Sequence, residues 1–177
     1  LVDIVRSGKA LYAGISNYPA EVAGKAFRYL EEHDVHCILH QVKSSMMGRL
    51  PETTGQLTQA KENGTGFIAF SPLAQGLLTS RYLDGIPSDS RAARNASLKS
   101  NTITEETLGK IRALNQMAQE RGQSLAQMAL AWDLKDDLVT SVIIGASSVA
   151  QLEDNLKALE NTHFSAEELQ KIDSILG

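Results

Sequence analysis

The sequence has very little of what defines several protein classes. It contains one cysteine, Cys37, so a disulfide framework is excluded, and the apolar run Cys37–Leu39 predicts a buried, unpaired thiol in a reducing compartment. No stretch approaches the roughly 18 apolar residues that a membrane helix requires. The N-terminus also lacks the charged and apolar pattern of a signal peptide. We therefore expect a soluble, cytoplasmic protein without a membrane partner.

A surplus of positive charge is also missing. The chain has 17 Lys and Arg against 21 Asp and Glu, a formal net charge of -4, and its sequence pI is about 5.6. The broad basic surface of a nucleic-acid-binding protein is therefore absent, and neither DNA nor RNA is expected as a partner. No metal is expected either, because His33, His36, His40 and His163 show no metal-ligand spacing with Cys37.

The chain does contain enough apolar material for one folded unit over residues 1–177. Of these residues 42% are hydrophobic and 21% are charged, which suits a single domain with its own core. The chain begins at Leu1 rather than Met, in a pattern typical of the end of a helix. We therefore expect a preceding segment.

Four short apolar runs predict strands. Each is nearly continuous in apolar residues, as in parallel strands that are buried on both faces. Helical patterns separate them, which indicates βαβ units and a parallel sheet, either doubly wound or closed into a barrel. The runs are Ala10–Ser16, His36–Val42, Gly66–Ser71 and Thr140–Ser147.

Helices are predicted from capping residues and apolar periodicity. One begins at Pro19, because proline is tolerated at the first helical position. A long amphipathic helix ends at Gly122, and capping patterns open further helices at Ser124, Ser148 and Ser165. The polar segment 83–104 is long for a connection and predicts a functional or mobile loop. Residues expected on the inward faces are Val22, Ala26, Tyr29, Leu30, Ile111, Leu114, Trp132, Leu152, Leu156 and Leu159.

Polar residues follow the first predicted strand. In parallel βα folds, ligands bind where strands end and helices begin. Ser16 and Asn17 place a hydroxyl and an amide at such a point, where they can hold a carboxamide or cap the next helix. The two residues alone favour the cap.

The third strand ends in the run Phe70–Leu78, Phe-Ser-Pro-Leu-Ala-Gln-Gly-Leu-Leu. An aromatic ring that leaves a buried strand can stack on a flat ligand ring. Pro72 and Gly76 indicate a turn whose backbone N–H groups can face a pyrophosphate. A core phenylalanine followed by an ordinary turn is the competing interpretation.

The fourth strand leads directly into a helix through Gly145, Ala146 and Ser147. The N-terminus of that helix presents N–H groups and the positive end of its dipole, which favours a phosphate. Gln151 and Asn155 are four residues apart and share a helix face, where their amides can contact a purine. Simple helix capping also accounts for this pattern.

In combination these motifs resemble the aldo-keto reductase superfamily. The resemblance is strongest to the branch of potassium-channel β-subunits and bacterial glyceraldehyde-3-phosphate reductases, and it covers essentially the whole chain. Its most specific parts are Gly8-Lys9-Ala10 leading to Gly14-Ile15-Ser16-Asn17-Tyr18, the run Phe70–Leu78, and Gly145-Ala146-Ser147 with Gln151, Asp154 and Asn155.

The resemblance implies an (α/β)8 barrel of the TIM-barrel family that binds NADPH across its mouth without a G-x-G-x-x-G motif. It matches the predicted strands to the fifth to eighth of that barrel, so this chain is expected to be about half a barrel. It also implies roles for individual residues. Ser16, Asn17 and Gln41 would hold the nicotinamide amide, and Phe70 would stack on its ring. The pyrophosphate would lie along Ser71, Pro72, Leu73, Ala74, Gln75, Gly76 and Leu78, near Arg81 and Arg91, while Gly145, Ser147, Gln151, Asp154 and Asn155 would meet the adenosine 2′-phosphate and the adenine.

Two departures from the family pattern matter. Family members commonly have Gln-Pro-Ser-Tyr-Asn where this chain has Gln41-Val42-Lys43-Ser44-Ser45. In addition, the catalytic Asp, Tyr, Lys and His of the family belong to the first half of the barrel, so no catalytic residue is assigned here. In that mechanism NADPH gives a hydride to a carbonyl while the tyrosine donates the proton.

The resemblance leaves two classes of function open. One is NADPH-dependent reduction of a small aldehyde or ketone by the parent protein, with this chain as the cofactor-binding half. The other is a nucleotide-sensing regulatory subunit or a catalytically inactive fragment. Because half a barrel leaves strand edges open, the missing N-terminal half of the barrel, or a second copy in a homo-oligomer, is expected as a partner.

Overall fold

A sheet of four parallel strands forms the centre of the computed structural model, which describes residues 1–83, 85–87, 93 and 103–177. The strands follow the chain in the order β1-β2-β3-β4. All four predicted runs contain a strand, and the expectation of a parallel α/β sheet is confirmed. The strands are shorter than the apolar runs: β1 (Ala13–Ser16), β2 (Cys37–Lys43), β3 (Gly66–Phe70) and β4 (Ser141–Ile143).

The register aligns the carboxyl ends of the strands. Ser16 lies opposite Gln41, and Lys43 lies opposite Phe70. Phe70 in turn lies opposite Ile143. The polar strand ends predicted from the sequence therefore share one edge of the sheet, where parallel sheets bind ligands.

The two faces of the sheet differ in burial. Ile15, His40 and Phe67, which lie opposite one another in the register, are at most 6% exposed. On the other face, Ser16 is exposed and Ile143 is 46% exposed. The expectation of strands buried on both faces was therefore wrong, because no described element covers the second face.

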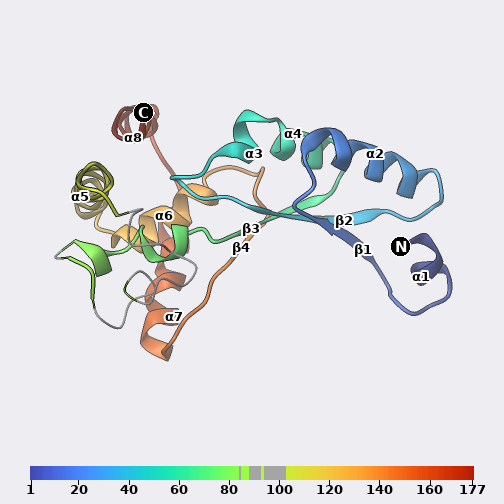
Figure 1. Cartoon of the computed structure of the whole chain (residues 1–177), viewed down its shortest axis with the longest axis horizontal. Coiled ribbons are helices and arrows are strands. Elements are labelled where there is room, and N and C mark those ends of the chain that lie inside the picture. The colour runs from blue at the N-terminus through green and yellow to red at the C-terminus, as the bar shows by residue number, and fades with distance from the viewer. Residues whose placement is uncertain (84, 88–92, 94–102) are drawn as a thin grey trace.

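Helices cover the buried face. Figure 1 shows α2 (Ala20–Glu31), α3 (Leu50–Thr53) and α4 (Gln56–Glu62) along one side of the sheet. The predicted inward face of α2 was wrong in part: Val22 and Tyr29 are 43% and 57% exposed. Leu30 is buried as predicted, and Ala23 and Phe27 are buried in place of Val22 and Tyr29; all three buried residues pack in one cluster with Ile15. The large apolar ring of Phe27 lies on the buried face, so the inward face of α2 is rotated from the predicted one.

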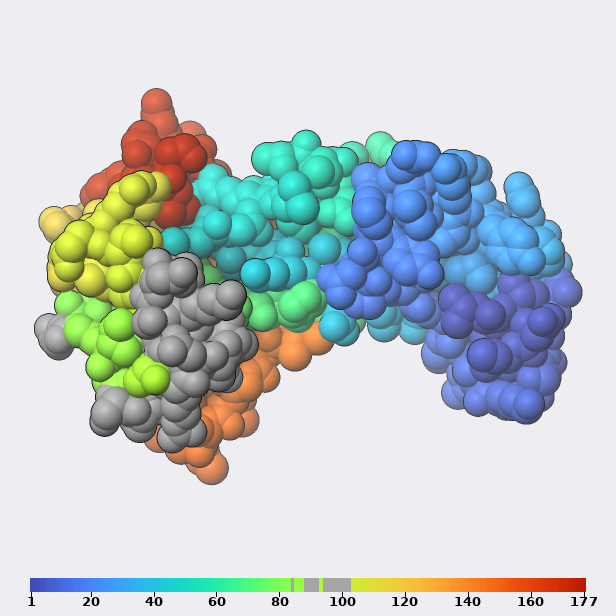
Figure 2. Space-filling view, in the orientation of Figure 1, coloured from blue at the N-terminus to red at the C-terminus, as the bar shows by residue number. Residues whose placement is uncertain are grey.

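A second layer of helices gathers at the end of the molecule away from α1 (Val2–Arg6). The core here forms where α5 (Glu105–Glu120), α6 (Leu125–Asp133) and α8 (Ala166–Leu176) meet, and it includes Trp132 and Ile111, as predicted. Ser124 and Ser165 form the capping boxes expected from the sequence. The molecule is elongated, and Figure 2 shows the N-terminal part and this group of helices at opposite ends of a curved outline.

The helix α7 (Val149–Leu156) departs from the predicted packing. Leu152, Leu156 and Leu159, expected on an inward face, are 42%, 54% and 63% exposed, and Val149 is 73% exposed. The apolar residues of this segment do recur with helical spacing, but no described element covers their side chains. Contiguous exposed apolar residues are typical of contact surfaces.

Several other expectations can be compared with the structure. Cys37 is 1% exposed and unpaired, as predicted, and burial raises the pKa of its thiol. Most of the polar segment 83–104, Arg91 included, lies outside the described residues. Within the described part of the chain, no helix combines the length and apolarity needed to cross a membrane. No group of three potential metal ligands occurs among the same residues.

Candidate cofactor site

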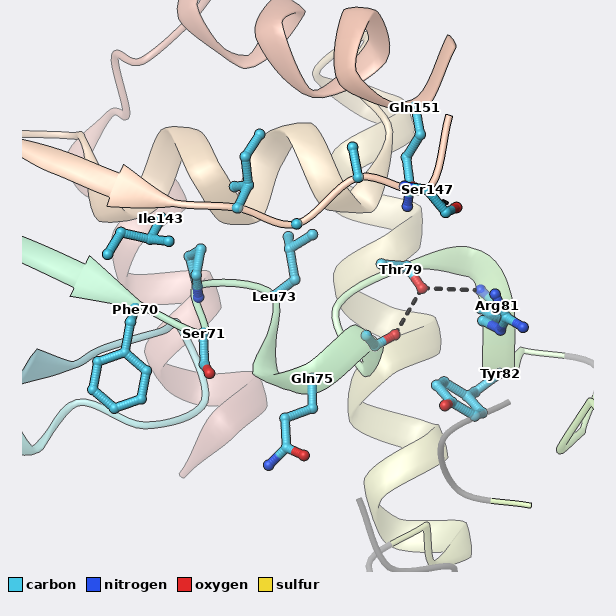
Figure 3. Close-up of a pocket in the computed structure, with 15 residues that line it drawn as sticks. Phe70, Ser71, Leu73, Gln75, Thr79, Arg81, Tyr82, Ile143, Ser147 and Gln151 are labelled. Carbon is cyan, nitrogen blue, oxygen red and sulfur yellow. Dashed lines mark hydrogen bonds between the residues drawn. The ribbon is translucent and has the colours of Figure 1, made fainter. Parts of the chain in front are cut away.

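A groove of about 730 Å³ opens between the carboxyl ends of β3 and β4 (Figure 3). The turn after β3 forms one wall, and the loop from β4 to α7 forms the other. Its lining contains most of the residues that the sequence predicted for a dinucleotide. The lining residues are Phe70, Ser71, Pro72, Leu73, Gln75, Gly76, Thr79, Arg81, Tyr82, Ile143, Ile144, Gly145, Ala146, Ser147 and Gln151.

The turn after β3 is built on backbone angles that side chains rarely adopt. Ser71, Ala74 and Gln75 have φ values of 57°, 47° and 61°, and Gly76 has 100°. Each non-glycine residue held at positive φ stores on the order of 1 kcal/mol or more of strain, a feature that clusters at ligand sites. Figure 3 shows that Phe70, Ser71 and Gln75 extend to the same side of this turn.

Backbone hydrogen bonds hold the turn in place. The N–H groups of Ala74 and Gly76 donate to the carbonyl oxygens of Ser71 and Leu73, at 2.9 and 2.8 Å. Leu78 donates to the same Leu73 carbonyl at 3.2 Å. These N–H groups serve the turn itself. Anion binding on this wall must therefore depend on side chains and on the remaining N–H groups.

Thr79, which the sequence analysis missed, organises the approach to Arg81. Its hydroxyl donates to the Gly76 carbonyl at 2.7 Å and accepts from the Arg81 N–H at 3.2 Å. It thereby caps the short helix η2 (Ser80–Tyr82). The signal was present in the sequence, because a threonine directly before a helical turn is a preferred N-cap.

The opposite wall begins where β4 ends at Ile143. Ser148 caps α7 by accepting from the Gln151 N–H at 3.2 Å, as the capping pattern predicted. The Gln151 side chain, however, turns to Ser147. Its Oε1 accepts from the backbone N–H of Ser147 at 2.7 Å and from the Ser147 hydroxyl at 3.0 Å. Ser147 and Gln151 therefore form one polar unit at the N-terminus of α7, and the helix dipole gives this end a partial positive charge.

Asp154 and Asn155, one turn further along α7, lie outside the lining of the groove. The Asp154 carboxylate accepts from Gln127 Nε2 at 2.7 Å and from the Ser124 hydroxyl at 3.4 Å, which ties α7 to α6. Asn155 is 5% exposed. Its Nδ2 is buried without a hydrogen-bond partner among the described residues. A buried donor of this kind is costly unless a water molecule or a ligand supplies the acceptor.

The residues expected at the nicotinamide end lie at the ends of β1 and β2. The Asn17 N–H donates to the Gln41 carbonyl at 2.9 Å, and Asn17 Nδ2 donates to the Ser16 hydroxyl oxygen at 3.3 Å. The helix-cap interpretation was wrong, because α2 has Pro19 at its N-cap and no side-chain cap. The side chains of Ser16 and Asn17 therefore do not cap α2.

Several residues that were predicted to contact the cofactor do not line the groove. Leu78 is fully buried in the core, and Ala74 packs against the same cluster. Ser16, Asn17 and Gln41 do not line the groove, although Phe70, opposite Lys43, connects it to their strands. A nucleotide that reached both places would lie extended along the strand ends.

Comparison with known proteins gives one family. The model described as "Aldo/keto reductase family" matches residues 1–177. An L-glyceraldehyde 3-phosphate reductase of Escherichia coli (strain K12) is 50% identical over 98% of this chain and 51% of its own length. A probable voltage-gated potassium channel subunit beta of Arabidopsis thaliana is 35% identical over 89% of this chain and 49% of its own. The chain therefore spans about half the length of these curated relatives.

A solved structure supports the fold. The crystal structure of a thermostable aldo-keto reductase, Tm1743, in complex with the inhibitor epalrestat superposes with a TM-score of 0.68 and 27% identity. The superposition covers 98% of this chain and 51% of the other. The expected superfamily and branch are thus confirmed, together with an α/β fold of the TIM-barrel kind.

Proposed function

Because this chain belongs to the aldo/keto reductase family, we propose that its groove binds NADPH for the reduction of a small aldehyde or ketone by the protein that contains it. The observation that carries the proposal is the convergence of both predicted walls on one cavity. Phe70 and the Ser71–Gly76 turn meet Gly145, Ser147 and Gln151 there, although more than 65 residues separate them in sequence. NADPH, when bound, supplies the hydride for carbonyl reduction.

The residues of the groove fit the parts of a dinucleotide. Phe70 would stack on the nicotinamide ring, and Ser16, Asn17 and Gln41 would hold the carboxamide. The turn after β3, with Arg81, would border the pyrophosphate. The Ser147–Gln151 unit and the N-terminus of α7 would meet the 2′-phosphate. The buried Nδ2 of Asn155 is suited to a purine nitrogen, because it is a donor without a partner among the described residues.

The chain would supply the cofactor half of an eight-stranded barrel. The four strands leave one sheet face uncovered, and apolar residues are exposed near both of its edges: Leu11 and Tyr12 before β1, and Ile143 and Leu152 at β4 and α7. A complementary set of βα units would cover these surfaces and pair with the strand edges. In this proposal the proton donor comes from those units.

A triose phosphate is the first substrate to test, because a relative at 50% identity is an L-glyceraldehyde 3-phosphate reductase. The second candidate function, nucleotide sensing by a regulatory subunit, is favoured by the relative described as a potassium channel subunit beta. Turnover separates the two. A reductase oxidises NADPH with an aldehyde present, whereas a sensor binds the nucleotide without comparable turnover.

The test is a titration of the complete protein with NADPH, followed by fluorescence, beside Phe70→Ala and the control Tyr29→Ala. Loss of ring stacking is expected to raise the Kd of Phe70→Ala about threefold to tenfold. Tyr29 is exposed on α2, away from the groove, and its variant should bind as the parent does. Absence of NADPH binding by the folded parent would refute the proposal.

A further inference from the structure

A second cavity, of about 660 Å³, lies beside the carboxyl ends of β1 and β2. Its lining includes Asn17 after β1, Lys43 at the end of β2, and Arg49, Thr54 and Gln56 from the segment around α3 and α4. We propose that this cavity binds the phosphate group of a phosphorylated aldehyde or ketone. This inference rests on the proposed reductase function and assigns the part of the substrate that does not react.

The charge of the cavity selects an anion. Lys43 and Arg49 both line it, and none of the described lining residues is acidic. Other lysines of the same region are neutralised by carboxylates: Lys61 by Asp137, and Lys135 by Glu52. Among the described residues, Lys43 has no such partner, and it is exposed. Its ammonium group is therefore available to a ligand in the cavity.

Arg49 is the fixed cation of the pair. Its Nη1 pairs with Asp173, its Nε donates to the Met46 carbonyl at 2.9 Å, and its guanidinium lies 4.7 Å from the ring centroid of Trp132. The remaining nitrogen, Nη2, is buried without a partner in the described part of the chain. The Asp173 carboxylate balances the charge of this guanidinium, so Arg49 supports the wall of the cavity and Lys43 is the cation that a phosphate would contact.

The cavity adjoins the place proposed for the nicotinamide. Asn17, one of the three residues proposed to hold the carboxamide, lines it and donates through its backbone N–H to the Gln41 carbonyl. Lys43 lies opposite Phe70 in the sheet, next to the ring that would stack on the nicotinamide. A short substrate anchored by its phosphate in this cavity would thus hold its carbonyl carbon close to the hydride donor.

The rest of the lining is apolar, with Pro19, Val42 and Pro51 among its residues. Apolar walls lower the local dielectric, and charge pairs inside them are stronger than on an open surface. They also give a short carbon chain a surface to contact. The site therefore combines a phosphate anchor with an apolar wall, as recognition of a phosphorylated carbonyl compound requires.

The experiment compares glyceraldehyde 3-phosphate with unphosphorylated glyceraldehyde as substrates of the complete protein, at saturating NADPH. Lys43→Met is expected to lower kcat/KM for the phosphorylated aldehyde about tenfold to a hundredfold, mainly through KM. Its kcat/KM for glyceraldehyde should stay unchanged. Lys43→Glu should show a larger selective loss. Lys25→Met, which removes an exposed lysine paired with Glu21 on α2, is the matched control and should affect neither substrate.

Other outcomes overturn the inference. Equal losses for both aldehydes, or no loss for either, would show that Lys43 does not bind the phosphate. A raised Kd for NADPH in Lys43→Met would show that the cation serves the cofactor. Because Lys43 is exposed at a strand end, its truncation should leave thermal unfolding unchanged, which is checked in parallel.

A second measurement separates this inference from the proposed function. If the parent reduces neither aldehyde, the reductase proposal fails, and calorimetry with glycerol 3-phosphate then tests the cavity alone. Binding that Lys43→Met abolishes supports the phosphate site. Binding that survives the substitution, or no binding by the parent, refutes it.

Discussion

The hydroxyl of Ser44, just after β2, donates a 3.2 Å hydrogen bond to Oδ1 of Asp133 at the end of α6. Asp133 is 1% exposed, and its Oδ2 is buried without a partner among the described residues. Burial raises the pKa of this carboxyl to about 7, against the smaller opposing effects of the Ser44 hydrogen bond and Lys135. An ionised Asp133 is therefore destabilising in the folded chain.

Asp133→Asn is expected to stabilise the protein at alkaline pH. Since the folded-state pKa lies above the ordinary value of 3.8 for an aspartate, the protonated carboxyl favours the folded state at low pH. That advantage declines as the pH rises from about 4 to 7 and is absent above this range. The free energy of unfolding of the variant should exceed that of the parent by on the order of 4 kcal/mol at pH 8, and by little at pH 4. Urea unfolding at both pH values measures the difference.

The control is Asp137→Asn. Asp137 is exposed, and its hydrogen bond with Lys61 lowers the pKa of its carboxyl, so its pH dependence has the opposite sign. The ionised Asp137 carboxylate stabilises the folded protein above the ordinary pKa of the group, and this stabilisation declines as the pH falls. An Asp133→Asn variant that gains nothing between pH 4 and 8 would contradict the assignment of a raised pKa.

Gly76→Ala is expected to destabilise the turn after β3. Gly76 has a φ of +100°, and a Cβ there would lie 3.7 Å from the buried Tyr82 ring. The added Cβ therefore has room, and the loss of stability comes from the strained backbone conformation, about 1–3 kcal/mol. The matched control is Gly109→Ala in α5, where a Cβ meets nothing within 4 Å. It should gain roughly 0.5–1 kcal/mol, because alanine favours a helix interior.

Chemical denaturation of the two glycine variants measures both signs in one experiment. NADPH affinity should fall in Gly76→Ala only, because the turn forms a wall of the groove. A stable Gly76→Ala variant with parental affinity would show that the positive φ is not required.

Local patterns were the part of the structure that the sequence predicted well. Ser124 and Ser165 form capping boxes with residues three positions later, and the parallel strands follow from short apolar runs between helices. These features depend on neighbours in sequence. The groove residues Phe70 and Gly145 were found for the same reason, since each lies near the carboxyl end of a predicted strand.

Contacts between distant segments could not be predicted in this way. The Ser44–Asp133 pair joins residues 89 positions apart. The inward face of α2 depends on which stripe meets the sheet, and periodicity alone placed Val22 and Tyr29 inside. Asp154, proposed for adenine, bonds to Gln127 of another helix. The resemblance implied a contact for Asp154 but contained no information about this competing partner.

Asn155→Ala is expected to weaken NADPH binding. The buried Asn155 Nδ2 has no acceptor among the described residues, so a purine nitrogen would gain one hydrogen bond from it. Loss of that bond should raise the Kd about threefold to tenfold. Asn161→Ala is the control, because among the described residues the hydrogen bonds to Asn161 go to its backbone carbonyl, from Arg121 and Gln123. Unchanged affinity in a folded Asn155→Ala variant would remove Asn155 from the proposed site.

The chain by itself, residues 1–177, is expected to self-associate. Its uncovered sheet face and strand edges adjoin the exposed apolar residues of α7, of which Leu152 and Leu156 are 42% and 54% exposed. Such surfaces favour pairing with another chain. Leu152→Glu with Leu156→Glu should shift the mass measured by light scattering toward the monomer, whereas Ile86→Glu, at an exposed apolar residue outside α7, should not. A parent chain that elutes as a monomer and unfolds cooperatively would show that the open face needs no partner, and the half-barrel proposal would then lose its physical basis.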